Sequence, residues 1–306
     1  MTLSLCTIGV SLLDEVLRNS LQGLLAGSIY SLGALSLTIS YSVTRIANFA
    51  VSEYVTIGAY AAALATIGGF DPIMALFLAM MVSSILALAV DESVYKPLYR
   101  RGSSPLQLLI ASIGVMLLIR YLWSIYADYS DMLFLSSRYS LTPIAYAMGS
   151  PITNLHILSL GFLGVASVSL YMFRHRTMIG KAMRALASNP ELASASGIPV
   201  WRVRRITWIV SGLLAGAMGA LWAFYTSINT ETGWRLLLWI FASSIIGGIR
   251  SIPLTIAGGF IIGFSENLGM WFFNRFFGVD TAYKPIIAYL AIASTLLIGR
   301  GRLFMR

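Results

Sequence analysis

The stretch RHRTMIGKAMRALASNPELASASGIPVWRVRR, residues 174–205, is a polar and basic interruption in a chain of long apolar runs. It carries seven Lys or Arg residues and a single acid, Glu191. A charged side chain at the bilayer centre costs about 2.5 kcal/mol or more, so this segment lies outside the hydrocarbon. Basic loops of this length stay on the cytoplasmic side of a membrane. The stretch therefore predicts membrane-embedded runs on either side of a cytoplasmic segment.

The same stretch has the local signals of two short helices. Residues 179–186 are rich in Ala and favour a helix, and Asn189-Pro190 interrupts it because a residue before proline avoids the α region. A second turn over residues 191–196 ends at Gly197, which suits a C-terminal cap. Two small helices offered to the cytosol predict a docking element for a soluble partner. The alternative is a solvated linker between two membrane spans.

The composition predicts an integral membrane protein. Hydrophobic residues make up 58% of the sequence and charged residues 11%, against about a quarter charged in soluble domains. The apolar runs are about twenty residues long and do not alternate, which predicts helices rather than barrel strands. Residues 1–13 lack a basic region and a cleavage site, so we do not expect a signal peptide. The lone Cys6 excludes an intrachain disulfide.

The predicted fold is an all-α, polytopic transmembrane bundle of about eight to nine spans in one domain, residues 1–306. The seventh element is short, so it crosses at a tilt or re-enters, and a Gly/Pro break at 247–253 follows it. A weak internal echo links the first two elements with the seventh and eighth. Arg120 is expected to extend toward the interface. The predicted elements are residues 21–41, 46–67, 73–90, 106–127, 155–173, 206–225, 236–248, 254–273 and 283–298.

Two of these apolar elements contain acids. Asn48 and Glu53 lie in the second element, and Glu266 and Asn267 lie in the eighth. Ionisable residues within spans are costly and by default mark a functional site, so these four are the candidate substrate pathway. Two alternatives stay open: Glu53 lies near a headgroup on an interfacial helix, or the four side chains only form hydrogen bonds that hold the bundle together.

Positive charge sets the expected orientation. The predicted inner segments hold 15 of the 21 Lys and Arg residues, which places the N-terminus outside and the C-terminus in the cytoplasm of a cell-membrane protein. No phosphate-binding loop and no His-Glu-x-x-His motif occurs, and His156 and His175 lack metal-ligand spacing. We therefore expect no enzyme activity, no metal and no cofactor. A bundle with a docking loop and no ATPase is typical of a transporter subunit that a separate protein drives.

Four segments resemble, in order and spacing, the LivH-type permeases of branched-chain amino acid ABC transporters. They are NSLQGLLAGSIYSLGALSLTISYSVTRIANFAVSEYVTIGAY, VYKPLYRR, GKAMRALASNPELASASGIPVWRVRRITW and IIGGIRSIPLTIAGGFIIGFSENL. The resemblance covers nearly the whole chain, and the family also includes urea and short-chain amide permeases. It departs from the family's Asn-Phe-Ala-His-Gly-Glu signature, because here Val51 and Ser52 precede Glu53.

The resemblance implies a permease subunit of a binding-protein-dependent importer, most simply for branched-chain or other hydrophobic amino acids. Its partners would be two ATP-binding subunits, a second related permease and an extracytoplasmic binding protein. Two other classes stay open: an ion-coupled secondary transporter that uses Glu53 or Glu266 as a relay, and an intramembrane enzyme. The resemblance makes the 180–198 region a coupling helix, with contacts at or near Arg184, Ala187, Pro190, Glu191, Gly197 and Ile198.

Overall fold

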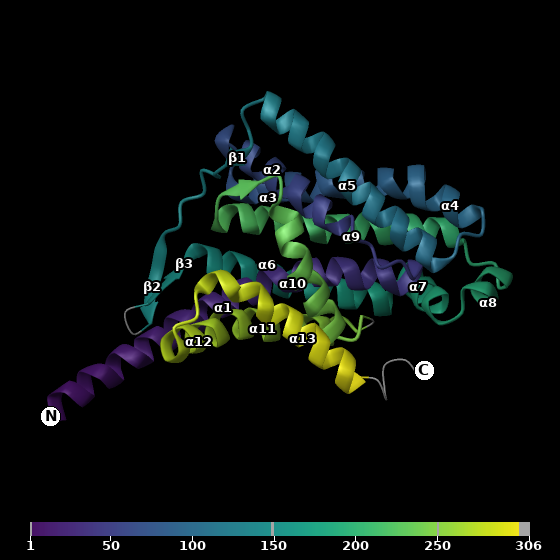
Figure 1. Ribbon diagram of the computed structural model, residues 1–306. Coiled ribbons are helices and arrows are strands. Elements are labelled where there is room, and N and C mark those ends of the chain that lie inside the picture. The colour runs from purple at the N-terminus through teal and green to yellow at the C-terminus, as the bar shows by residue number, and fades with distance from the viewer. Residues whose placement is uncertain (1, 148–149, 250, 300–306) are drawn as a thin grey trace.

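The computed structural model describes residues 2–147, 150–249 and 251–299, and within them the chain is a helical bundle (Figure 1). Six helical segments are long and apolar enough to cross a membrane, and α2 and α10 are shorter apolar helices. The helices are α1 (Thr2–Thr44), α2 (Val51–Ile67), α3 (Pro72–Val90), α4 (Lys96–Arg100), α5 (Pro105–Tyr129), α6 (Asn154–Arg176), α7 (Met178–Ser188), α8 (Pro190–Ala195), α9 (Val200–Tyr225), α10 (Thr232–Ile246), α11 (Ile252–Phe264), α12 (Met270–Phe277) and α13 (Lys284–Gly299).

Two π-helical turns, one 3-10 turn and four short strands complete the part of the chain that the structure describes. The π-helical turns η1 (Asp91–Tyr95) and η2 (Ser265–Gly269) interrupt two long helices, and η3 (Thr281–Tyr283) is a 3-10 turn. The strands pair only in twos: β1 (Phe134–Leu135) with β4 (Ile228–Asn229), and β2 (Pro143–Ala147) with β3 (Ser150–Thr153). They lie at the left in Figure 1, which we call the strand end, opposite the α7–α8 end. The predicted all-α bundle is confirmed.

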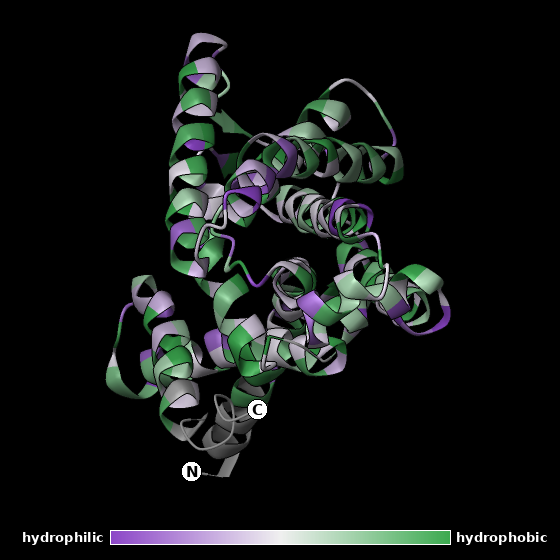
Figure 2. Ribbon diagram, turned by 90° about the vertical axis from the view of Figure 1, so that its right-hand side faces the viewer, coloured by the Kyte–Doolittle hydropathy of each residue, from purple (hydrophilic) through white to green (hydrophobic). Residues whose placement is uncertain are grey.

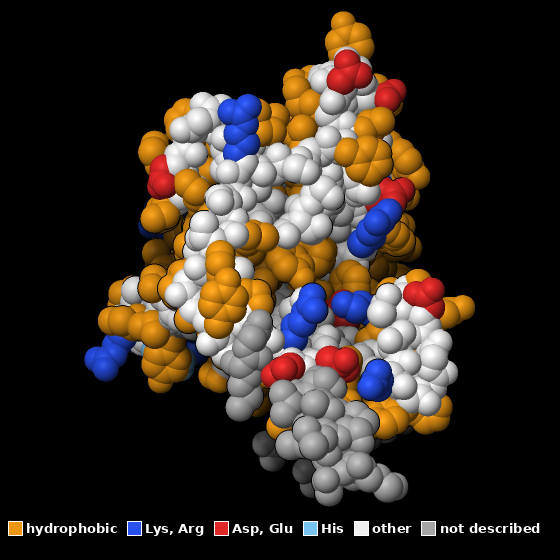
Figure 3. Space-filling model, turned by 90° about the vertical axis from the view of Figure 1, so that its left-hand side faces the viewer, with side chains coloured by type: hydrophobic (Ala, Val, Ile, Leu, Met, Phe, Trp, Pro, Cys, Tyr) orange, Lys and Arg blue, Asp and Glu red, His pale blue; other side chains and the backbone are white. Residues whose placement is uncertain are grey.

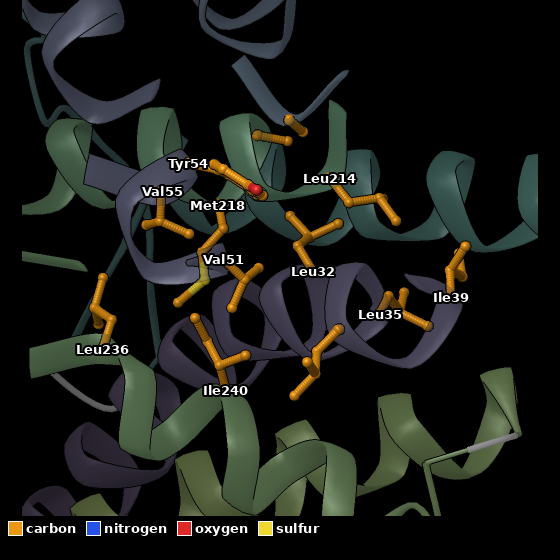
Figure 4. Packing of buried hydrophobic residues seen from close by; sticks show 14 of the residues in the cluster. Leu32, Leu35, Ile39, Val51, Tyr54, Val55, Leu214, Met218, Leu236 and Ile240 are labelled. Carbon is orange, nitrogen blue, oxygen red and sulfur yellow. The ribbon is translucent and has the colours of Figure 1, made fainter. Parts of the chain in front are cut away.

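The core lies between α1, α2, α9 and α10. Figure 4 shows Leu32 and Leu35 of α1, Tyr54 of α2, Met218 of α9 and Ile240 of α10 in one apolar cluster. Of the most apolar window of α1, 94% is buried, against 22% for α5. Small residues make α1 and α9 narrow enough to be surrounded by other helices. The outer helices expose many large apolar side chains, because lipid surrounds them. Figure 2, a view from the α7–α8 end, shows that hydrophobic residues are frequent along the helices.

Glycine allows two helix pairs to approach closely. A Cβ at Gly212 of α9 would lie 2.5 Å from the Cα of Ser84 on α3. A Cβ at Gly263 of α11 would lie 2.5 Å from the carbonyl oxygen of Gly23 on α1. No side chain other than hydrogen fits these crossings, so both pairs of backbones are locked together.

The element order occurs twice. The series α1, α2, α3–η1–α4, α5 corresponds to α9, α10, α11–η2–α12, α13. The two series run in opposite directions, because α1 leads toward the α7–α8 end and α9 leads away from it (Figure 1). The series are interlocked, since α3 packs along α9 and α11 along α1. The predicted echo is therefore wrong in its pairing, because α1–α2 correspond to α9–α10 rather than to the seventh and eighth elements.

Several boundaries differ from the expectation; the second element begins at Val51 rather than at residue 46, so Asn48 lies outside its helix. Helix α1 begins at Thr2, well before the expected first span. Helix α9 begins at Val200, so the cations 202–205 lie in a helix rather than in the loop. Arg204 is buried there because an acid on α3–η1 pairs with it. The strand end, seen in Figure 3, mixes acidic and basic side chains, whereas the α7–α8 end carries most of the cations of residues 96–101 and 174–205.

Candidate functional site

Glu53 lies in the first turn of α2 and forms a buried ion pair with Arg120 of α5. The Arg120 Nη2 and Nε atoms donate to Glu53 Oε1 at 2.8 and 3.2 Å, and Ser52 Oγ donates at 3.1 Å. The Glu53 side chain is 1% exposed and that of Arg120 is 10% exposed. The Arg120 guanidinium also lies 4.6 Å from the ring centre of Trp234 on α10. This pair therefore ties α2, α5 and α10 together.

The predicted extension of Arg120 to the membrane interface is wrong. A lone buried carboxylate would be too costly, so the arginine turns inward to neutralise Glu53. The interfacial alternative for Glu53 does not fit either, because the carboxylate is enclosed by protein. The sequence signal for the pair is weak, since the two residues are 67 positions apart.

Asn48 lies in the link before α2, and its hydrogen bonds hold that link in place. Its Oδ1 atom accepts from the Tyr95 hydroxyl at 2.7 Å and from the Ala50 N–H at 3.1 Å. The first contact joins the link to η1, and the second begins α2 as a side-chain cap does. Asn48 and Glu53 thus have different partners and do not form one polar cluster.

Glu266 and Asn267 lie in the π-helical turn η2, where they meet Tyr30 and Lys284. The Tyr30 hydroxyl donates to Glu266 Oε2 at 2.7 Å, and Lys284 Nζ lies 4.0 Å from Glu266 Oε1. Asn267 Oδ1 accepts from the same Nζ at 3.4 Å, and its Nδ2 donates to the Gly263 carbonyl at 2.9 Å. The π-helical turn shifts the helix register so that both side chains face the bundle. Tyr30 and Lys284 are site residues that the sequence reasoning missed.

A third buried acid, Asp91 of η1, pairs with Arg204 of α9. Arg204 Nη2 lies 2.6 Å from Asp91 Oδ1, and its Nε donates to the same oxygen at 2.8 Å. The next residue, Glu92, is partly exposed and pairs with Lys96 and Arg205. The sequence signal for this network is the Asp-Glu pair directly after an apolar run. The predicted elements end at residue 90, so the pair was expected in the loop that follows.

The predicted coupling segment forms α7 and α8 at the end of the bundle, with an extended residue between them. Asn189 has φ −146° and ψ 103°, and its Oδ1 caps α8 by accepting from the Leu192 N–H at 3.0 Å. Gly197 closes α8 with φ +82°, a conformation that glycine adopts without strain. Both local signals thus have the predicted conformations.

The six candidate coupling residues divide between two positions. Pro190, Glu191 and Gly197 are exposed on α8 and its cap. Arg184, Ala187 and Ile198 are partly buried and hold the segment in place. Arg184 Nη1 donates to the Arg174 carbonyl, the Ala187 carbonyl accepts from Arg45 Nη2, and Ile198 packs against the core.

The most prominent apolar side chain on α8 is Leu192, which the sequence reasoning did not select. It is 65% exposed, while its neighbour Ala193 is buried against the bundle. No set of three or more His, Cys, Asp or Glu residues that could hold a metal occurs within the described residues. The candidate site thus consists of buried ion pairs within the bundle and of the exposed short helices α7 and α8 at its end.

The family described as "Branched-chain amino acid transport system / permease component" matches residues 19–298. The chain belongs to this family. "Probable branched-chain amino acid transport permease protein LivH" of Methanocaldococcus jannaschii is 34% identical over 87% of this chain and 85% of the relative. "High-affinity branched-chain amino acid transport system permease protein LivH" of Escherichia coli is 27% identical over 92% of this chain and 93% of the relative.

A more distant relative is named for a different substrate, ribose. "Ribose import permease protein RbsC" of Bacillus subtilis is 26% identical over 63% of this chain and 59% of the relative. All three relatives are named as permeases, so the family consists of membrane transport components rather than enzymes.

Proposed function

We propose that this chain is the permease subunit of a binding-protein-dependent ABC importer for branched-chain or other hydrophobic amino acids. Family membership and the names of the LivH relatives support the solute class. The observation that carries the coupling part of the proposal is α8, a capped helix that presents the exposed Leu192 at one end of the bundle. An apolar side chain on a rigid helix end suits insertion into a groove of a soluble protein.

The partner that fits this surface is one of two ATP-binding subunits. Closure of those subunits around ATP would move the groove, and α8 would follow because its base is bonded to the bundle through Arg45 and Arg184. Only Ser196 to Pro199 separate α8 from α9. A displacement of α8 therefore reaches the central helix α9 as a rigid movement, which is the kind of step that alternating access needs.

Charge supports the orientation. The α7–α8 end carries Lys96, Arg100, Arg101 and the cations of α7, so we assign it to the cytoplasm. The strand end and the N-terminus then face outward, and the C-terminus lies inside. A binding protein would deliver solute to the strand end, and a second related permease would complete the path.

The buried charges argue against an ion-coupled secondary transporter. Glu53 is neutralised by Arg120, and Glu266 is bonded to Tyr30 with Lys284 nearby. A carboxylate that relays protons or cations needs a state in which it is free to bind them. The distant RbsC relative and the urea and amide permeases leave other small polar solutes as the alternative substrate class.

The test is co-purification with the candidate ATP-binding subunits, followed by ATP-dependent leucine uptake in proteoliposomes. Leu192→Ser is expected to reduce co-purification and uptake by about tenfold or more, because it removes an apolar anchor. Leu141→Ser, at an exposed leucine of the strand end, is the matched control. If Leu192→Ser retained the ATP-binding subunits as the control does, α8 would not be the coupling contact. Uptake without ATP on an ion gradient would contradict the importer proposal itself.

A further inference from the structure

A cavity of about 360 Å³ lies at the strand end, between the end of α9 and the start of α10. Its size falls in the range of small-ligand sites, which begins at about 300 Å³. Polar and apolar groups line it together. The 710 Å³ groove between α3, α6 and α9 differs, because it is lined almost entirely by apolar side chains and suits lipid. A cavity of about 330 Å³ beside Glu92 and Lys96 lies at the opposite end of the bundle, and none of its described lining residues is aromatic.

One side of this cavity carries charge and hydrogen-bonding groups. Arg235 of α10 lines it, and its Nη2 lies 3.3 Å from Glu231 Oε2. Both side chains are more than half exposed, so their mutual attraction is small and either can exchange its partner. Asn229 and Thr232 line the same side. Arg235 lines the cavity and suits a carboxylate, and Glu231, which pairs with Arg235 but does not line the cavity, is the nearby group that suits an ammonium.

The other side is aromatic and aliphatic. Trp222, Trp239 and Leu236 line it, and Tyr30 lies between the two tryptophans. The Tyr30 ring is 6.1 Å from the Trp222 ring and 5.7 Å from the Trp239 ring, both in stacked geometry. Such a surface suits a branched or aromatic side chain.

The indole N–H of Trp239 is a buried donor with no hydrogen-bond partner within the described part of the chain. An unsatisfied buried donor is costly, so it marks a position where a ligand can supply the missing acceptor. Two other indoles, Trp123 and Trp208, share this property, but neither lines this cavity. The Trp239 ring lines the cavity, but its N–H is closed off from it and becomes available to a ligand only when the ring turns.

We propose that this cavity is an amino-acid site of the permease itself, where solute rests after its release from the binding protein. The carboxylate of the amino acid binds Arg235 and, once the indole ring turns toward the cavity, the Trp239 N–H. Its ammonium group meets Glu231, the ion-pair partner of Arg235, and its apolar side chain lies against Trp222 and Leu236. The site rests on the proposed function, because it assumes that amino acids cross this chain.

The site also gives Tyr30 and Glu266 a place in the path. Tyr30 separates the two tryptophans of the cavity from Glu266, to which its hydroxyl donates at 2.7 Å. Movement of Tyr30 would therefore open the cavity toward the polar group at η2. This explains why a buried carboxylate is kept behind an aromatic wall, and it orders the path as cavity, Tyr30 and then Glu266.

The experiment measures ATP-dependent leucine uptake by the reconstituted complex at saturating leucine-loaded binding protein. We expect Arg235→Gln and Trp239→Phe each to lower uptake about tenfold, because each removes one hydrogen bond to the carboxylate. Arg138→Gln, an exposed cation of the same end, and Trp123→Phe, which removes another unpartnered indole N–H, are matched controls and should keep wild-type rates.

A second readout separates solute binding from docking of the binding protein. Stimulation of ATP hydrolysis by loaded binding protein should persist in Arg235→Gln and Trp239→Phe. If both variants transported like their controls, or if stimulation fell in parallel with uptake, the amino-acid site would be wrong. If the wild-type complex moved no amino acid at all, the proposed function would fail first, and the two failures are thus distinguishable.

Discussion

The buried pair of Glu53 and Arg120 allows a sharp test of what the intramembrane charges do. The perturbation is a set of three variants: Glu53→Gln, Arg120→Gln and the double substitution. Two unit charges about 4 Å apart attract by about 4 kcal/mol at an effective dielectric constant of about 20. Desolvation offsets much of this attraction while the pair is intact, so the pair's net contribution to stability is small.

Breaking the pair has a different consequence. Each single variant leaves one charge buried without its partner, which costs about 3–5 kcal/mol. In Glu53→Gln the Arg120 guanidinium retains the ring of Trp234, 4.6 Å away, and a neutral amide in place of the carboxylate, so its charge is not neutralised. The double variant removes both charges, so its loss of stability should be smaller than the sum of the single losses by about 2 kcal/mol or more.

The assay is the free energy of unfolding of the purified chain in mixed micelles, measured by titration with sodium dodecyl sulfate. Glu231→Gln breaks a surface pair with both side chains more than half exposed, and it should cost less than about 1 kcal/mol. Additive losses from the two single substitutions would refute the claim that these charges neutralise each other. Uptake by a stable double variant would show that Glu53 holds the bundle together rather than contacting solute.

Two further outcomes follow from the packing and the other buried pair. Gly212→Val should destabilise the bundle by about 1–3 kcal/mol because its Cβ meets the Ser84 backbone, whereas Gly114→Val, with open space around it, should alter the same unfolding titration little. Asp91→Asn should lower the unfolding free energy by about 3–5 kcal/mol because it leaves a buried arginine unpaired. The partly exposed neighbour substituted as Glu92→Gln should cost about 1 kcal/mol or less, and equal effects of the two would contradict the burial argument.

The sequence predicted the elements well because bilayer insertion acts on local composition. Apolar runs, the break near residue 250 and the positions of Asn189 and Gly197 in α8 depend on nearby residues, and the structure has them where expected. The buried partners could not be predicted in the same way. Arg120 looks like an interfacial arginine until α5 is packed beside α2, because the acid that holds it lies 67 positions away.

The candidate site was predicted in part for the same reason. Glu53 and Glu266 were found because an acid in an apolar run is visible by itself. The cavity beside Trp239 was missed, since tryptophans and an arginine near a predicted turn are ordinary at a membrane interface. Only the packing of α1, α9 and α10 brings Tyr30, Trp222 and Trp239 into one stack.

The interlocked arrangement of the two halves constrains how the cavity and α8 can communicate. Helix α9 begins close to α8 and ends at Tyr225, and its Trp222 lines the cavity, so one helix joins α8 to the cavity. Its start is tied to η1 by Asp91 and Arg204, and its middle is locked to α3 by Gly212. Helix α9 therefore cannot bend freely at either place, and a push on α8 must shift α9 together with α3. Tyr30 belongs to α1, which is bonded to α9 through Ser36 and Ser211, so such a shift reaches the Tyr30 ring that stacks on Trp222. We therefore expect the aromatic wall behind the cavity to be where ATP-driven movement is converted into access for solute.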